Sequence, residues 1–277
     1  MRVLLVLGRV SNLPTVWSNC LAAWLLAGGG AWQRFGLVCL GATLLYTGGM
    51  FLNDAVDAGF DRRYRPERPI PSGQISARIV WVLAGVCLAG GWAVFFALGK
   101  LPTQFASALL LAIVVYDLVH KHTTFSPVLM AACRCLLYFL AASSVGTSAT
   151  RDVLWRAMAL AAYIIGLSYL ARGESTGKRL ASWTVILLFV PIIVAFADPV
   201  DGVVSITLIA VLLAAWIGWC LSARLAWRVP FLSKGVAGLL AGIVLVDWLA
   251  TGGNSYSAAF LLLFVLALFL QRVAPAT

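Results

Sequence analysis

The chain has little charge and very few acids. Of its 277 residues, 11% are charged and ten are acidic, whereas 62% are hydrophobic and the mean hydropathy is +0.97. A soluble domain carries far more charge than this, so the composition excludes a soluble globular protein. The sequence also lacks a low-complexity tract or a long linker. We therefore expect a single membrane domain over residues 1–277.

Several functional classes are excluded by missing patterns. The six cysteines all fall in apolar runs, without the spacing of a disulfide framework or a zinc site, and we expect them to pack as small hydrophobic residues. His120 and His122 are two residues apart and do not share a helix face, so they do not predict a metal site. The D-G-x-x-A-R signature of the CDP-alcohol phosphotransferases is absent. No cleavable signal peptide precedes the first apolar run, which we read as a retained anchor.

Apolar runs long enough to approach or cross a bilayer recur along the whole sequence. They cover residues 13–31, 36–53, 77–99, 102–119, 125–147, 153–171, 181–197, 203–223, 233–250 and 255–271. The run at 233–250 is rich in glycine and contains Asp247, which is also consistent with a half-crossing helix. The sequence thus predicts an all-α integral membrane protein with nine or ten transmembrane helices.

The net charge of +10 predicts topology rather than nucleic-acid binding. Most lysines and arginines fall at the N-terminus and in the polar loops after the second, fourth and sixth helices. Because positively charged loops stay on the cytoplasmic side, we expect the N-terminus and these loops to be cytoplasmic.

Three of the ten acids lie close together in residues 53–61. Asp54, Asp57 and Asp61 are spaced by three and four residues, so they share one face of a helix, with Asn53 beside them. Clustered carboxylates need a compensating cation, and their hard oxygen atoms suit Mg²⁺. The simpler alternative is a solvated, acidic helix end.

Cations follow the acids directly in the segment Arg62-Arg63-Tyr64-Arg65-Pro66-Glu67-Arg68. Arginine and lysine donors next to a metal are one way in which proteins hold a departing diphosphate. Arg65 and Arg68 are therefore candidate substrate-binding residues. The alternative is that these arginines only set the membrane topology.

The segment Asn53-Asp54-Ala55-Val56-Asp57-Ala58-Gly59-Phe60-Asp61 resembles the N-D-x-x-D-x-x-x-D signature of the UbiA superfamily of intramembrane prenyltransferases. The continuation Arg65-Pro66-Glu67-Arg68-Pro69-Ile70-Pro71-Ser72-Gly73 is similar to that of the family. The segments Arg9-Val10-Ser11-Asn12-Leu13-Pro14-Thr15 and Tyr116-Asp117-Leu118-Val119-His120-Lys121 also agree with it. The resemblance, which is closest to the 4-hydroxybenzoate polyprenyltransferases, implies a bundle of nine or ten transmembrane helices.

The resemblance further implies Mg²⁺-dependent transfer of a prenyl group from an allylic diphosphate to an aromatic or other lipophilic acceptor. It implies that Asp54, Asp57 and Asp61 hold the metal and, with Lys121, act in catalysis. The family's second acidic motif corresponds to Ser168–Lys178, where Glu174 is the only acid and is a candidate second metal ligand. The implied location is the plasma membrane of a bacterium, with membrane lipid and no nucleic acid as partner.

Further candidate substrate-binding residues lie near helix ends or inside apolar runs. They are Asn53, Tyr116, Arg134, Tyr169, Arg172, Glu174 and Lys178. Tyr116 and Tyr169 could shield an allylic cation with their rings, or belong to an interfacial aromatic belt. Arg134 needs a partner inside the membrane: Asp117, the diphosphate or a structural pair. A non-catalytic or transport protein that binds an isoprenoid lipid on the same scaffold is the alternative function.

Overall fold

The structure is a computed structural model that describes residues 2–121, 123–146, 150–176, 182–199, 202–225, 232–253 and 255–274. In these ranges it is helical throughout and has no strand. The elements are α1 (Arg2–Leu7), the 3-10 helix η1 (Val10–Asn12), α2 (Leu13–Leu26), α3 (Trp32–Tyr64), α4 (Ala77–Leu98), α5 (Lys100–Val119), α6 (Ser126–Ser143), α7 (Arg151–Thr176), α8 (Ser182–Ala197), α9 (Val203–Leu225), α10 (Leu232–Ala250) and α11 (Ser257–Val273).

Each of the ten predicted apolar runs coincides with one helix from α2 to α11, which confirms the all-helical class. Among the described residues, six helices are long and apolar enough to cross a membrane, namely α3 to α7 and α9. Three further apolar stretches, in α8, α10 and α11, are shorter. The chain is a multi-pass membrane protein.

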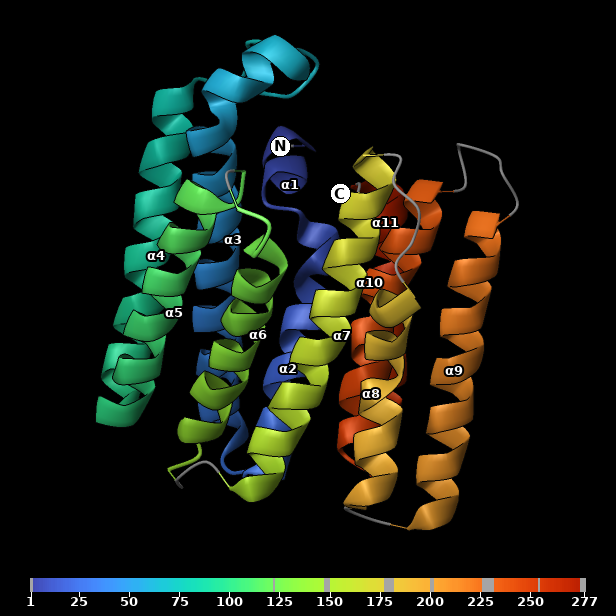
Figure 1. The fold of residues 1–277 in the computed structure, drawn as a ribbon. Helices are drawn as coiled ribbons and strands as arrows, with labels where there is room; N and C mark the ends of the chain where they lie inside the picture. Colours follow the sequence, from blue (N-terminus) through green and yellow to red (C-terminus); the bar gives the residue numbers. More distant parts are fainter. Residues whose placement is uncertain are drawn as a thin grey trace.

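From α2 onward, successive helices run in alternating directions, so the connections gather at the two ends of the bundle (Figure 1). The α3–α4 connection lies at the same end as α1, and so does the α5–α6 connection (Figure 1). We call this the motif end, because the acid-rich segment of α3 leads into it. Residues from α1, α3 and α5 that are far apart in the sequence therefore meet there.

Helix α2 occupies the centre of the bundle and contacts α3, α6, α10 and α11. Even its polar residues Ser18 and Asn19 are fully buried. On the outer helix α9, by contrast, Val204, Leu208 and Val211 are spaced by four and three residues and are highly exposed. An apolar stripe of this kind suits contact with lipid tails.

Helices α3 and α4 approach closely because glycines line their interface. A Cβ atom on Gly48 would lie 2.9 Å from the backbone nitrogen of Leu88, and one on Gly91 would lie 2.9 Å from the carbonyl oxygen of Gly41. Small residues allow such close contact between membrane helices. This packing fixes the position of α3, and with it the acids further along that helix.

Candidate functional site

The acids lie on the inner face of α3, near its end. Asp54, Asp57 and Asp61 are all buried, as their spacing predicted for one helix face. Helix α3 continues past Asp61 to Tyr64, further than the predicted apolar run. It ends there because the residue before Pro66 is disfavoured in helical geometry.

Arg68 folds back from the α3–α4 connection onto two of the acids. Its Nη1 atom lies 3.2 Å from Oδ1 of Asp54 and 3.1 Å from Oδ2 of Asp61. The second carboxylate oxygen of Asp61, Oδ1, is buried and has no hydrogen-bond partner in the described part of the chain. One arginine therefore neutralises two carboxylates, and one buried carboxylate oxygen atom stays without a partner among the described residues.

Asp57 is held from the end of α5. The Nζ atom of Lys121 lies 2.6 Å from Oδ1 of Asp57 and 4.0 Å from the ring centre of Phe60. The Nε2 atom of His120 lies 3.5 Å from Oδ2 of Asp57. The hydrogen bond with Asp57 raises the pKa of the His120 imidazole above its ordinary value, although partial burial opposes this shift.

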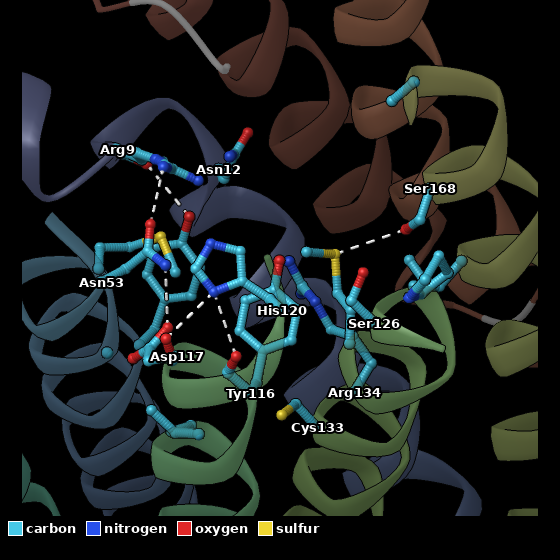
Figure 2. A pocket seen from close by; sticks show the side chains of 18 of the residues that line it. Arg9, Asn12, Asn53, Tyr116, Asp117, His120, Ser126, Cys133, Arg134 and Ser168 are labelled. Carbon is cyan, nitrogen blue, oxygen red and sulfur yellow. Dashed lines mark hydrogen bonds between the residues drawn. The ribbon is translucent and has the colours of Figure 1, made fainter. Parts of the chain in front are cut away.

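Asn53 joins α3 to two other segments. Its Nδ2 atom donates to Oδ1 of Asp117 at 3.0 Å, and its Oδ1 atom accepts a hydrogen bond from Arg9 at 3.3 Å (Figure 2). The backbone of Arg9 has φ 42°, in the left-handed region that non-glycine residues rarely adopt. Such strain persists where surrounding contacts hold it, and here it places the guanidinium over Asn53.

A cavity of about 1010 Å³ reaches from these residues into the bundle, and Asp54 and Asp61 are not among the side chains that line it. Asp57, His120, Lys121 and Arg68 lie at its polar mouth. The remaining wall is largely apolar and comes from α3, α5, α6, α7 and α10. The side chains of this wall include Leu45, Leu109, Ile113, Leu137, Ile164 and Leu240. A charged mouth above an apolar interior suits a ligand with an anionic head and a hydrocarbon tail.

Arg134 lines the same cavity from α6, and its partners differ from those considered in the sequence analysis. It donates to Asn19 Oδ1 at 2.7 Å, and to the carbonyl oxygen and Oγ1 of Thr15 at 3.2 and 3.0 Å. Asn19 in turn donates to Asp247 at 2.7 Å. Arg134 forms no ion pair with Asp117, whose Oδ1 is occupied by Asn53. The suggested Arg134–Asp117 pair is therefore wrong.

Three of the other predicted residues line the cavity, and one does not. Arg65 and Tyr116 line the cavity, and the Tyr116 ring stacks on His120 with 5.1 Å between ring centres. Arg172 lines the cavity and donates to the Thr123 carbonyl oxygen at 2.9 Å. Tyr169 does not line the cavity.

The hydroxyl of Tyr169 donates to the Thr124 carbonyl oxygen at 3.0 Å, and its ring meets Trp183 edge-on. Both contacts hold the ring away from the cavity, so its position does not fit the predicted shielding of a cation. The side chain of Glu174 and the whole of Lys178 lie outside the described residues.

Mg²⁺ fits the chemistry of the acids, although they are not gathered around one point. In the described ranges no three His, Cys, Asp or Glu side chains converge as a metal cluster. Mg²⁺ does not require this, because it commonly uses one or two carboxylates and completes its shell with water and substrate phosphate. The unpartnered Oδ1 of Asp61 offers one such ligand.

Three residues of the site, Arg9, Asp117 and His120, were not predicted to belong to it. Arg9 lies in the N-terminal segment noted for its family resemblance, but only the fold brings it to Asn53. Asp117 and His120 lie within the segment that ends at Lys121. Their closeness in sequence to Lys121 was the feature that could have placed them at the site.

The fold and the site together define a multi-pass membrane protein with an acid-lined mouth above an apolar cavity. The UbiA prenyltransferase family matches residues 12–231, and the chain belongs to this family.

Among curated relatives, the digeranylgeranylglyceryl phosphate synthase of Sulfolobus acidocaldarius is 35% identical over 83 residues, which is 30% of each chain. The 4-hydroxybenzoate octaprenyltransferase of Albidiferax ferrireducens is 25% identical over 115 residues, 40% of this chain and 39% of the relative. The matched stretches thus span less than half of the relatives' lengths.

Solved structures show the same fold at low sequence identity. A UbiA homologue from Aeropyrum pernix K1 aligns over 87% of this chain and 96% of its own, with a TM-score of 0.67 and 14% identity. A UbiA homologue from Archaeoglobus fulgidus, solved bound to GPP and Mg²⁺, aligns over 99% and 98%, with a TM-score of 0.55 and 13% identity.

Proposed function

We propose that this protein is a Mg²⁺-dependent prenyltransferase. It moves a prenyl group from an allylic diphosphate to a lipophilic acceptor. We expect this acceptor to be an aromatic compound. The proposal rests on one observation: buried carboxylates and cations lie together at the mouth of a large apolar cavity. The names of the relatives and the GPP and Mg²⁺ of the Archaeoglobus structure support it.

The residues at the mouth would bind the diphosphate end of the donor. Asp54, Asp57 and Asp61 would hold Mg²⁺, which when bound neutralises charge on the departing diphosphate. Arg68 and Lys121, which now neutralise these carboxylates, would turn their N–H groups to the phosphate oxygens. The apolar wall would hold the prenyl tail.

In the proposed reaction the bond between the allylic carbon and the diphosphate oxygen breaks, and the acceptor carbon forms a new bond to the allylic carbon. The ring face of Tyr116, which lines the cavity, would stabilise the allylic cation. The acceptor carbon then loses a proton. We assign the proton-accepting role to Asp117, which lines the cavity and whose Oδ2 has no hydrogen-bond partner among the described residues.

The test is Mg²⁺-dependent release of pyrophosphate by the purified protein. Geranyl, farnesyl and geranylgeranyl diphosphates serve as donors, with a panel of aromatic acceptors. Asp57→Asn should lower release by at least a hundredfold, whereas Asp152→Asn, at the start of α7 and away from the cavity, should not. Donor binding without release from any acceptor would favour the non-catalytic lipid-binding alternative.

We also propose that the motif end faces the cytoplasm, since the basic connections gather there. Ser72, which is exposed in the α3–α4 connection, is a suitable reporter. A cysteine introduced at Ser72 in a cysteine-free background should react with a membrane-impermeant maleimide in inverted vesicles and not in intact cells. The opposite labelling would reverse the orientation.

A further inference from the structure

Arg134 lies well inside the bundle, away from the acids at the mouth. It is eight residues beyond Ser126, the first residue of α6, and therefore about 12 Å further along the helix. Tyr46, whose ring centre lies 6.0 Å from the Arg134 guanidinium carbon, precedes Asp57 on α3 by roughly 16 Å along the helix. The mouth has cations of its own in Arg68 and Lys121.

The hydrogen bonds of Arg134 leave one edge of its guanidinium available. Nη1 donates to Asn19 and to the Thr15 carbonyl oxygen, and Nη2 donates one hydrogen to Thr15 Oγ1. Since a guanidinium has five N–H groups, the Nε hydrogen and the second Nη2 hydrogen have no partner in the described part of the chain. These two N–H groups are parallel and can donate hydrogen bonds to both oxygens of one carboxylate.

The surroundings hold this edge in place. Thr15 and Asn19 fix the guanidinium to α2, a helix whose residues are mostly buried. Asn19 and Ser18 both donate to Oδ2 of Asp247, so the side chain of Asn19 links Asp247 to Arg134. A guanidinium that is already ordered binds a ligand without further loss of side-chain entropy.

We propose that Arg134 is the residue that selects the acceptor, by binding a carboxylate on it through the free guanidinium edge. This inference rests on the proposed prenyltransferase function. With the diphosphate at the acids and the carboxylate at Arg134, the acceptor ring lies in the cavity between them. The donor and the acceptor are then each bound through a charged group, and the prenyl tail of the donor lies against the apolar wall.

The experiment measures acceptor binding apart from turnover. Binding of 4-hydroxybenzoate and of the uncharged 4-hydroxybenzamide to the purified protein is followed by calorimetry, with Mg²⁺ and inorganic pyrophosphate present. Arg134→Gln should weaken 4-hydroxybenzoate binding by about tenfold or more and change 4-hydroxybenzamide binding by less than twofold. Arg134→Lys, which keeps the charge without the paired N–H groups, should give an intermediate loss.

Three outcomes would overturn the inference: equal losses for both ring compounds, undiminished 4-hydroxybenzoate binding in Arg134→Gln, or no 4-hydroxybenzoate binding by the wild type. Equal losses would assign Arg134 a purely structural role between α6 and α2. Geranyl diphosphate affinity and the Tm of each variant serve as controls for folding. Arg134-dependent binding without pyrophosphate release would support this site while refuting the proposed function.

Discussion

Arg68 allows a direct test of the charge balance at the mouth. In Arg68→Gln, Asp54 and Asp61 lose the cation that they share, and both carboxylates remain buried. A hydrogen bond to a charged group contributes about 1.5–3 kcal/mol. Both bonds come from one nitrogen atom on a side chain that is 25% exposed, and solvent screening reduces their value. We expect a net loss of about 1–2 kcal/mol in the free energy of unfolding.

The assay is thermal unfolding of the detergent-solubilised protein, first in EDTA and then with Mg²⁺. For a chain of this size the loss corresponds to a fall in Tm of about 2–8 °C in EDTA. Because a ligand that binds only the folded state stabilises it, Mg²⁺ should raise the Tm of Arg68→Gln more than that of the wild type. The metal would replace the missing cation.

Arg63 provides the matched control. It is exposed, lies five residues before Arg68 and forms no ion pair in the described ranges, so Arg63→Gln should leave the Tm unchanged under both conditions. An unchanged Tm for Arg68→Gln in EDTA would show that the pairing contributes nothing. A destabilised Arg68→Gln that Mg²⁺ fails to restore would contradict a metal site at these acids.

Three further predictions concern other parts of the bundle. Asp117→Asn should lower kcat for pyrophosphate release at least tenfold while geranyl diphosphate affinity changes less than twofold; an unaltered kcat would remove Asp117 from proton transfer. In metal-free buffer the pair of His120 with Asp57 stabilises the folded state below the ordinary histidine pKa, and this contribution is lost as pH rises through the raised value. The Tm should therefore fall as the pH rises above the ordinary histidine pKa of about 6.5, and a profile of His120→Gln with the same slope would refute this. Gly48→Ala should cost about 1–3 kcal/mol by overpacking, as measured by Tm, while Gly85→Ala, with open space around its Cβ, should cost nothing.

The fold could be predicted largely from the sequence, because lipid leaves few options for the backbone. Helices satisfy their own backbone hydrogen bonds, so each long apolar run had to form one. The face shared by Asp54, Asp57 and Asp61 likewise follows from the spacing of residues along a helix. Both predictions depend on local periodicity alone.

The pairing of side chains between helices could not be predicted in this way. Asp117 was one of three partners suggested for Arg134, yet Arg134 bonds to Asn19 on α2. Tyr169 was expected at the cavity, yet its hydroxyl binds the Thr124 carbonyl oxygen. Which face of one helix meets which neighbour depends on packing across the whole bundle, and a single sequence does not record this.

The length of α3 sets the depth of its acids in the membrane. With 33 residues it is about 50 Å long, well beyond the roughly 30 Å of a hydrocarbon core. If Trp32 anchors one interface, Asp54 to Asp61 lie about 33–44 Å along the helix, at the level of the opposite lipid head groups. The charged head of the proposed prenyl diphosphate donor would then stay at the level of the lipid head groups while its tail lies among the lipid chains.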